Sequence, residues 1–373
     1  MPDEPPPGVR RRELRTGFST GTAAAAAAQG ALYALLDLPV PATVPAPLPD
    51  GRHLPVTLHR HGRLGSRGEA SVIKDAGDDP DVTHGAEIGV RVGWLNGAGA
   101  EARVDLRGGE GVGRVTRPGL PVAVGEPAVN PVPRRMLRRS LRLVWEALRP
   151  GAPLRLAVEV FVPGGEDLAR RTLNPRLGIL GGISILGTTG LVKPFSHAAY
   201  RATILTALKV ARAAGLDHVV FSTGGQSEEF MRIRLPHLPE TAFVQMGDYV
   251  EYALKAAAHL GFAQISVAAF FGKALKMAEG KGHTHASRGL PNLKALGALT
   301  LEITGNPVLA VAVAGANTAR QALELLLAGG AAAVLHLVGR RMLGALSAFA
   351  GPVPRLGAVL FDFDGAVRWE GSR

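Results

Sequence analysis

Residues 218–228 read His-Val-Val-Phe-Ser-Thr-Gly-Gly-Gln-Ser-Glu, and this stretch decides the fold. An apolar run of strand length is followed by a glycine pair, and a helical segment begins at Glu228. Strand, glycine loop and helix in this order are typical of α/β sheets, which bind cofactors beyond the carboxyl ends of their strands. We therefore expect a ligand-binding loop at Gly224, Gly225 and Gln226.

The same alternation continues toward the C-terminus. Residues 241–246 form the next apolar run and are followed by Asp248, at a place where an acidic residue commonly accepts hydrogen bonds from ribose hydroxyls. Further strands are expected at 263–270 and 355–361. Repeated strand–helix units predict an α/β Rossmann-like domain with a mostly parallel sheet over residues 151–373.

The first half of the chain is organised differently. An alanine-rich helix at about 20–37 is followed by alternating segments that read as strands, at 54–61, 69–74 and 88–94. A helix returns at about 131–149. Runs of strands with separate helices predict an α+β N-terminal domain, which we expect to occupy residues 1–150.

The composition limits the classes of function. The chain has 373 residues, 46% of them hydrophobic, no cysteine and a formal net charge of +11. The absence of cysteine excludes disulfides, a cysteine nucleophile and thiolate metal sites. The charge is compatible with nucleic acid, an anionic membrane surface or an acidic small molecule. However, 34 of the 42 basic residues are arginine in a chain rich in alanine and glycine, so codon bias explains much of it.

Targeting and membrane signals are not expected. The Pro-rich start lacks the order of a signal peptide, and no apolar run reaches about 18 residues. We expect a cytoplasmic protein with no membrane partner.

A hydroxyl- and glycine-rich segment, Ser19-Thr-Gly-Thr22, leads directly into the alanine run. Ser19, Thr20 or Thr22 can cap the helix, and free N–H groups at its start can bind a carboxylate. The alternative is a plain helix cap. The candidate substrate contacts here are Thr20, Gly21 and Thr22.

A second polar segment, residues 74–85, holds four aspartates. Such carboxylates repel one another unless a cation, arginines or a backbone turn accommodates them. An EF-hand is excluded because Pro80 takes the place of the turn glycine. Either the loop orients a ligand, or it is an Asp/Pro/Gly turn bonded to its own backbone. Its candidate substrate-binding residues are Asp75, Asp78 and Asp79.

An arginine-rich amphipathic segment begins at Asn130. Arginine forks suit carboxylates and phosphates, so Arg134 and Arg135 are candidates for an acidic ligand, although a solvated helix face is the ordinary alternative. A nucleic-acid-binding protein using residues 134–142 is the rival function. An aromatic content of only 5% disfavours it, because single-strand binding relies on stacking aromatics.

Other polar loops lie at expected strand ends. Thr188 and Thr189 belong to one of them and are candidate substrate contacts. Lys273, His283 and His285 add cationic and imidazole groups further on. The glycines of 108–113 suggest a phosphate loop, but no Gly-Lys-Ser/Thr follows, so a glycine-rich hairpin is the better interpretation.

Several of these stretches carry a family resemblance. They are Arg15–Thr22 with its alanines, Lys74–Thr83, Gly109–Thr116, Asn130–Met136, Pro163–Glu166, Asn174–Gly190 and Gly272–His285. With them the chain resembles the cobalt-precorrin-5B C1-methyltransferase family of the anaerobic cobalamin pathway, in order over about residues 14–290. One departure is Ala23, where the family usually has a cysteine, so a catalytic thiol is excluded at this position.

The resemblance implies S-adenosylmethionine as methyl donor and a cobalt-containing corrinoid ring with many carboxylates as acceptor, giving cobalt-precorrin-6A. Methyl transfer needs mainly alignment of donor and acceptor. His84 and His197 are candidates for a proton acceptor, and the donor is expected at Gly224, Gly225, Gln226 and Asp248. Cobalt would arrive with the substrate, so no protein-bound metal and no nucleic acid are expected, while a homo-oligomer is compatible with the sequence.

Overall fold

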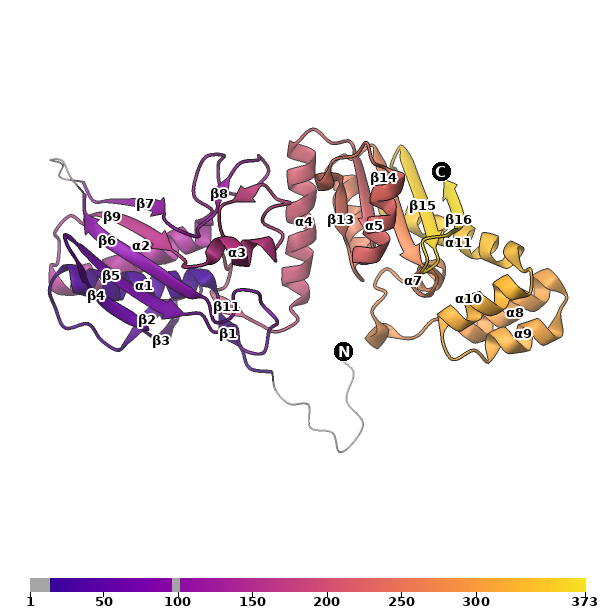
Figure 1. Cartoon of the computed structure of the whole chain (residues 1–373), viewed down its shortest axis with the longest axis horizontal. Coiled ribbons are helices and arrows are strands. Elements are labelled where there is room, and N and C mark those ends of the chain that lie inside the picture. The colour runs from indigo at the N-terminus through magenta and orange to yellow at the C-terminus, as the bar shows by residue number, and fades with distance from the viewer. Residues whose placement is uncertain (1–13, 96–100) are drawn as a thin grey trace, which may run out of the picture. The chain divides into compact units, whose positions relative to one another are not determined.

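The computed structural model describes residues 14–95 and 101–373, which fall into two compact units (Figure 1). The first unit ends at Ser196 and the second begins at His197. The sequence suggested a boundary near residue 150. Strand β9 (Arg155–Phe161) instead pairs with β6 and β7 inside the first sheet, so the first unit extends well past that point.

The N-terminal unit is built on a mixed five-stranded sheet. Its strands, in spatial order, are β4 (Arg60–Leu64), β5 (Arg67–Ile73), β6 (Glu87–Trp94), β9 and β7 (Arg103–Gly108). Only the β7–β9 pair is parallel. Smaller antiparallel pairs join β2 (Thr43–Pro47) to β3 (His53–Thr57), β1 (Gly17–Phe18) to β11 (Leu191–Val192), and β8 (Arg114–Val115) to β10 (Ile179–Leu180).

Helix α1 (Thr20–Leu35) is almost entirely buried against this sheet and helix α2 (Pro131–Leu148). Its alanine run, Ala23 to Ala28, is fully buried, because small side chains let the helix backbone approach the sheet closely. At Gly68 of β5, an added Cβ would overlap the carbonyl of Ala31. Helix α3 (Gly165–Arg170) completes the unit.

The C-terminal unit contains a second five-stranded sheet. Its order is β13 (Phe243–Gln245), β12 (His218–Ser222), β14 (Gln264–Phe270), β15 (Arg355–Phe361) and β16 (Val367–Ser372). The first four strands are parallel, and β16 is antiparallel to β15. The strand expected at 355–361 is confirmed, whereas β16 lies in the short polar tail that follows it.

Helices cover both faces of the second sheet. Side chains of α4 (His197–Ala213), α6 (Val250–His259), α7 (Phe271–Ala278) and α11 (Ala332–Ala350) form the larger core on one face. Helix α5 (Gly225–Arg234) packs on the other face through Met231. Three further helices lie between α7 and α11 in the chain: α8 (Leu293–Thr304), α9 (Pro307–Ala314) and α10 (Ala319–Ala328).

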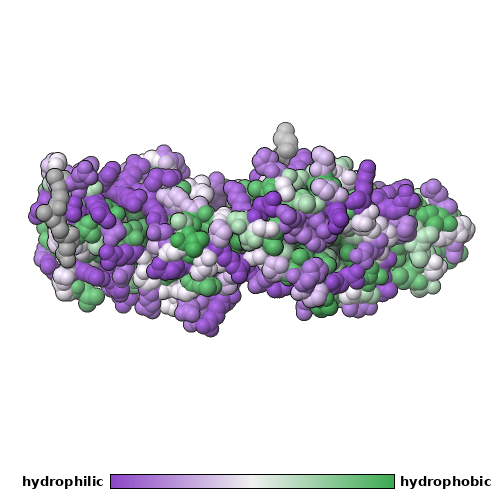
Figure 2. Space-filling view, turned by 90° about the horizontal axis from the view of Figure 1, so that it is seen from above, coloured by the Kyte–Doolittle hydropathy of each residue, from purple (hydrophilic) through white to green (hydrophobic). Residues whose placement is uncertain are grey.

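Apolar side chains are exposed at one end of this unit. Leu301, Val308 and Val311 are exposed on α8 and α9, and Figure 2 shows hydrophobic residues gathered at that end of the unit.

Helix α11 is long and apolar enough, by length and composition, to cross a membrane. However, Arg340 and Arg341 interrupt it at mid-length, where charged side chains are costly in a membrane, and one side of the helix is buried in the core.

Candidate functional site

The carboxyl edge of the second sheet has a topological switch point. The chain leaves β12 toward β13 on one side, whereas it leaves β14 toward β15 on the other. In open α/β sheets, ligands bind at such a point, outside the carboxyl ends of the strands. The loops that meet there contain Gly224 after β12, Asp248 after β13 and Lys273 after β14.

Gly224 and Gly225 leave open space above the loop that follows β12. An added Cβ at Gly224 would meet no atom within 4 Å, and one at Gly225 would meet only Gln245 Nε2 at 3.9 Å. Gly224 is extended, with φ 176°, and Gly225 does not lie in the left-handed region, so backbone conformation does not require glycine at either position. The two residues therefore form a shallow surface to which a ligand can come close.

Asp248 is the acidic group of this edge. Its Oδ1 accepts a hydrogen bond from Thr284 Oγ1 at 2.8 Å and lies 3.1 Å from the ammonium of Lys273. Burial alone would raise the pKa of Asp248, but Lys273 and Thr284 outweigh it and hold the pKa below its usual value. Asp248 is thus an anion at neutral pH, suited to accept hydrogen bonds from hydroxyl groups.

An aromatic and imidazole cluster adjoins Asp248. His197 Nδ1 is hydrogen-bonded to the Tyr249 hydroxyl, and the rings of Tyr249 and His283 meet edge to face at 4.8 Å. Burial lowers the pKa of His283, which therefore stays neutral at pH 7. Its Nε2 is buried and has no hydrogen-bond partner among the described residues. His197 accordingly lies beside the Asp248 edge, within the same unit.

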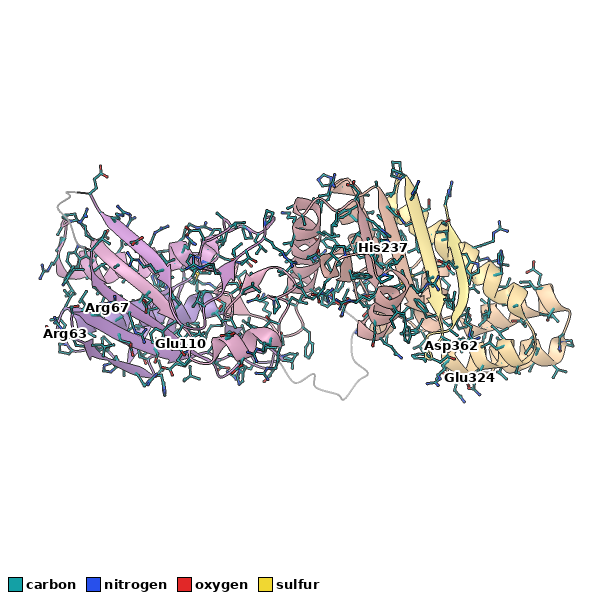
Figure 3. All side chains as sticks on the ribbon, turned by 45° about the horizontal axis from the view of Figure 1, so that its top comes forward. Arg63, Arg67, Glu110, His237, Glu324 and Asp362 are labelled. Carbon is teal, nitrogen blue, oxygen red and sulfur yellow. The ribbon has the colours of Figure 1, made fainter. Side chains whose placement is uncertain are left out.

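Gln226 has a structural contact. Its Nε2 donates to the carbonyl of Phe363 at 2.9 Å, joining the start of α5 to the β15–β16 turn. In that turn Asp362, labelled in Figure 3, is paired with Arg368 at 2.8 Å. The segment around Asp362 is therefore the turn that joins the last two strands of the sheet.

The N-terminal unit gathers a second set of candidates. Strand β1 pairs with β11, and Thr16 bridges to Gly77, so the segments around residues 16–22, 74–86 and 184–195 lie together. The backbone N–H of Phe195 also donates to Asp79 Oδ2 at 3.1 Å. Three stretches that are distant in the sequence are thus brought to one place.

At the start of α1 the polar groups are already bonded. Ser19 is the N-cap and accepts from Thr22 N, Gly21 N donates to Leu186 O at 3.0 Å, and Thr22 Oγ1 donates to Gly190 O at 2.6 Å. Thr20 Oγ1 accepts from Leu186 N at 2.9 Å. These residues are buried, so Thr20, Gly21 and Thr22 anchor the 184–190 segment, and the expected anion site has no free N–H group at Gly21 or Thr22.

The aspartates of the 74–85 segment are mostly bonded within the protein. Asp75 forms a two-pronged ion pair with Arg15, which lowers the pKa of Asp75 to about 2, and it accepts from Gly77 N at 2.8 Å. Asp78 accepts from the Arg15 backbone N–H at 2.7 Å. No group of three metal-ligating side chains occurs in residues 14–95 and 101–373. The loop is therefore an arginine-clamped turn.

His84 is unsuited to the role of proton acceptor. Its Nδ1 accepts a hydrogen bond from Ala76 N at 3.1 Å, so the neutral ring carries its proton on Nε2. Nδ1 also lies 3.8 Å from Asp75 Oδ1. With Nδ1 occupied and Nε2 protonated, exposed His84 can donate a hydrogen bond but has no free lone pair.

The two candidate arginines of α2 differ from each other. Arg134 donates to Val129 O at 2.7 Å and to Pro127 O at 3.2 Å, and it lies 3.3 Å from Glu126. Arg135 is exposed, and within the described chain no ion pair to it is found. Arg134 therefore holds the 126–130 segment, whereas Arg135 faces solvent.

Two glycine- and threonine-rich loops also belong to the N-terminal unit. Thr188 and Thr189 are exposed, and Thr189 Oγ1 donates to Leu191 O at 3.2 Å. At Gly111 an added Cβ would overlap the Val162 carbonyl, so the 108–113 glycines allow close approach to the protein's own backbone. This packing leaves no phosphate loop there.

The structure thus brings Gly224, Gly225 and Asp248 together in one unit and places His197 beside them. Lys273 and Thr284 complete that group and were not among the predicted site residues. A signal was present, since Lys273 directly follows the strand expected at 263–270. Its pairing with Asp248 requires two strands to become neighbours of β12, which no local pattern reveals.

Sequence comparisons identify the family. The profile of CbiD matches residues 8–194, and that of the CbiD C-terminal domain matches residues 283–372. The chain belongs to the CbiD family. It is 47% identical to the cobalt-precorrin-5B C(1)-methyltransferase of Thermus thermophilus, over 96% of this chain and 94% of the relative. The enzyme of the same name from Geobacillus kaustophilus is 44% identical, over 97% and 99%.

A solved structure is also similar in part. It is a crystal structure of the cobalamin biosynthesis protein CbiD from Archaeoglobus fulgidus, 24% identical, covering 74% of this chain and 89% of its own. Its TM-score is 0.38.

Proposed function

We propose that this protein is an S-adenosylmethionine-dependent methyltransferase that methylates C1 of cobalt-precorrin-5B, giving cobalt-precorrin-6A in anaerobic cobalamin biosynthesis. The observation that carries the proposal is the 44–47% identity, over nearly the full length of the chain, to enzymes bearing that name. The cobalt belongs to the substrate, and we propose that the enzyme acts in the cytoplasm.

For the donor, we propose the Rossmann-like carboxyl edge of the second sheet. S-adenosylmethionine supplies an electrophilic methyl group carried on a sulfonium. Open space over Gly224 and Gly225 suits close approach of such a ligand, and the Asp248 carboxylate suits the ribose hydroxyls. Gln226 would keep the start of α5 in place through Phe363. These residues bind and align, which is most of what methyl transfer requires.

For the proton that leaves the ring, we propose His197 as acceptor. When Nδ1–H of His197 donates to the Tyr249 hydroxyl, Nε2 carries the free lone pair. Burial raises the pKa of Tyr249, so its phenol remains neutral and keeps this hydrogen bond at neutral pH. His84 would instead donate a hydrogen bond to an acceptor on the substrate.

For the ring, we propose the exposed face of the N-terminal loops. Thr188, Thr189 and Arg135 would meet its carboxylates, while Thr20, Gly21, Thr22 and Arg134 hold the loops in shape. Asp75, Asp78 and Asp79 act in the same way, because their carboxylates bind Arg15 and Phe195.

The direct test is an anaerobic incubation of the purified protein with methyl-labelled S-adenosylmethionine and cobalt-precorrin-5B. We expect label to enter the tetrapyrrole, with a mass gain of one methyl group and stoichiometric release of S-adenosylhomocysteine. Absence of transfer by folded protein, or transfer to a ring position other than C1, would contradict the proposal.

A further inference from the structure

Lys273 occupies the switch point itself. It lies in the first turn of α7, directly after β14, and its Nζ is 3.1 Å from Asp248 Oδ1 and 3.4 Å from the carbonyl of Thr223. One side chain therefore connects the loops that follow three neighbouring strands. Its side chain is 32% exposed, so it is accessible to a ligand.

The other lysines of this region have different contacts. Lys276 is buried and donates to Thr284 O at 2.9 Å and to His285 O at 3.4 Å. Lys281 pairs with Glu279 at 2.6 Å. Among the described lysines of α7 and of the loop after it, Lys273 is the one that contacts the glycine loop, through the carbonyl of Thr223.

The contacts of Asp248 leave room for a ligand. Both Lys273 and Thr284 contact Oδ1, and no group of the described chain donates to Oδ2. Oδ2 is thus the oxygen that can accept from a ribose hydroxyl while the Lys273 ion pair persists. The Lys273 ammonium has three N–H donors, of which Asp248 and Thr223 take two.

A sulfonium nucleoside presents complementary chemistry to these groups. Its ribose offers hydroxyl donors and its amino-acid half ends in a carboxylate. With the ribose at Asp248 on the β13 side, the amino-acid half extends over Gly224 toward β14, where Lys273 provides a cation. A charge-assisted hydrogen bond of this kind is stronger than one between neutral groups.

We propose that Lys273 binds the carboxylate of the donor's methionine half. This inference rests on the proposed function, since it assumes that S-adenosylmethionine is the donor. Lys273 then has two tasks: it pairs with Asp248 Oδ1, and its third N–H binds the end of the ligand farthest from the adenine.

The test is a cycle of two ligands and several variants, measured by calorimetry. The ligands are S-adenosylhomocysteine and its decarboxylated analogue, which lacks only the carboxylate. We expect the wild-type protein to prefer the carboxylate ligand by about tenfold or more. Lys273→Met should abolish that preference, whereas Lys273→Arg should keep most of it. Lys281→Met is the matched control, because Lys281 is 34% exposed and also forms an ion pair.

Each outcome decides the matter. A preference retained in folded Lys273→Met, or no preference in the wild-type protein, would overturn the role of Lys273 while leaving the donor site in place. Failure of the wild-type protein to bind either ligand would instead overturn the proposed donor and this inference with it. Thermal melts establish folding, and Lys273→Gln serves as a second neutral variant should the Met variant unfold.

Discussion

The ammonium of Lys74 lies 2.6 Å from Asp81 Oδ2, and the Lys74 side chain is only 1% exposed. Asp81 is 28% exposed, and its Oδ1 accepts from both the backbone N–H and the hydroxyl of Thr83 at 2.7 Å. This ion pair joins the end of β5 to the turn that holds the clustered aspartates. The cation therefore depends on its partner more than the anion does.

Removing Asp81 should lower the free energy of unfolding more than removing Lys74. Asp81→Ala leaves a buried ammonium without its carboxylate and should lower the free energy of unfolding by about 3–5 kcal/mol. Lys74→Met leaves a half-buried carboxylate with its Thr83 hydrogen bonds and should cost about 1–3 kcal/mol. Urea unfolding of both variants checks the order. Equal losses, or a larger loss for Lys74→Met, would contradict it.

The same pair predicts a pH dependence. Burial would raise the pKa of Asp81, but Lys74 and Thr83 outweigh it, so the folded-state pKa lies below 3.8. The stabilisation is therefore present above about pH 4 and is lost as the pH falls through the lower folded-state value. The stability difference between wild type and Lys74→Met, from urea unfolding between pH 7 and 3, should shrink on acidification. A constant difference would refute the assignment.

Donor binding should depend on Asp248. We expect Asp248→Asn to weaken S-adenosylhomocysteine binding about tenfold or more in calorimetry, because an ionised acceptor is lost. Asp217→Asn is the control, since Asp217 precedes β12 at the opposite edge of the same sheet and pairs with Arg212. Unchanged affinity in Asp248→Asn would remove this residue from the donor site.

Two glycine-to-alanine substitutions should behave in opposite ways. At Gly21 an added Cβ would lie 2.7 Å from Pro133 Cγ and 3.1 Å from Leu186 O, so Gly21→Ala should destabilise the protein by about 1–3 kcal/mol. Gly225→Ala should leave the Tm unchanged yet weaken S-adenosylhomocysteine binding about tenfold, because the methyl group enters the ligand's space. Thermal melts and calorimetry measure both, and an unaltered affinity in Gly225→Ala would argue against a donor site over Gly224 and Gly225.

Substituting the two α2 arginines should have different effects, one on stability and the other on ligand binding. Arg134→Ala should lower the Tm, because it breaks hydrogen bonds to two carbonyls. Arg135→Ala should keep the Tm but weaken binding of a porphyrin with eight carboxylates about threefold, an effect that disappears at high salt. Arg142→Ala, exposed two turns further along the helix, is the matched control. An identical loss in Arg142→Ala would indicate only a general charge effect.

Local features were predictable because their causes are local. Ser19 caps α1 as its residue type suggests, the alanine run forms a buried helix, and the apolar run at 355–361 becomes β15. The domain boundary was not, because nothing in residues 155–161 shows that this strand pairs with β6 and β7.

The amino-acid sequence alone is enough to predict the family, the order of helices and most strands, and the glycine loop with the acidic residue that follows the next strand. Which polar groups are available to a ligand depends on the tertiary structure. Hydrogen-bond partners of Thr22, Arg134 and His84 lie on segments far away in the chain or on turns whose geometry packing imposes. Whether a side chain binds a ligand or the protein itself depends on such neighbours, and these arise when strands distant in sequence pair.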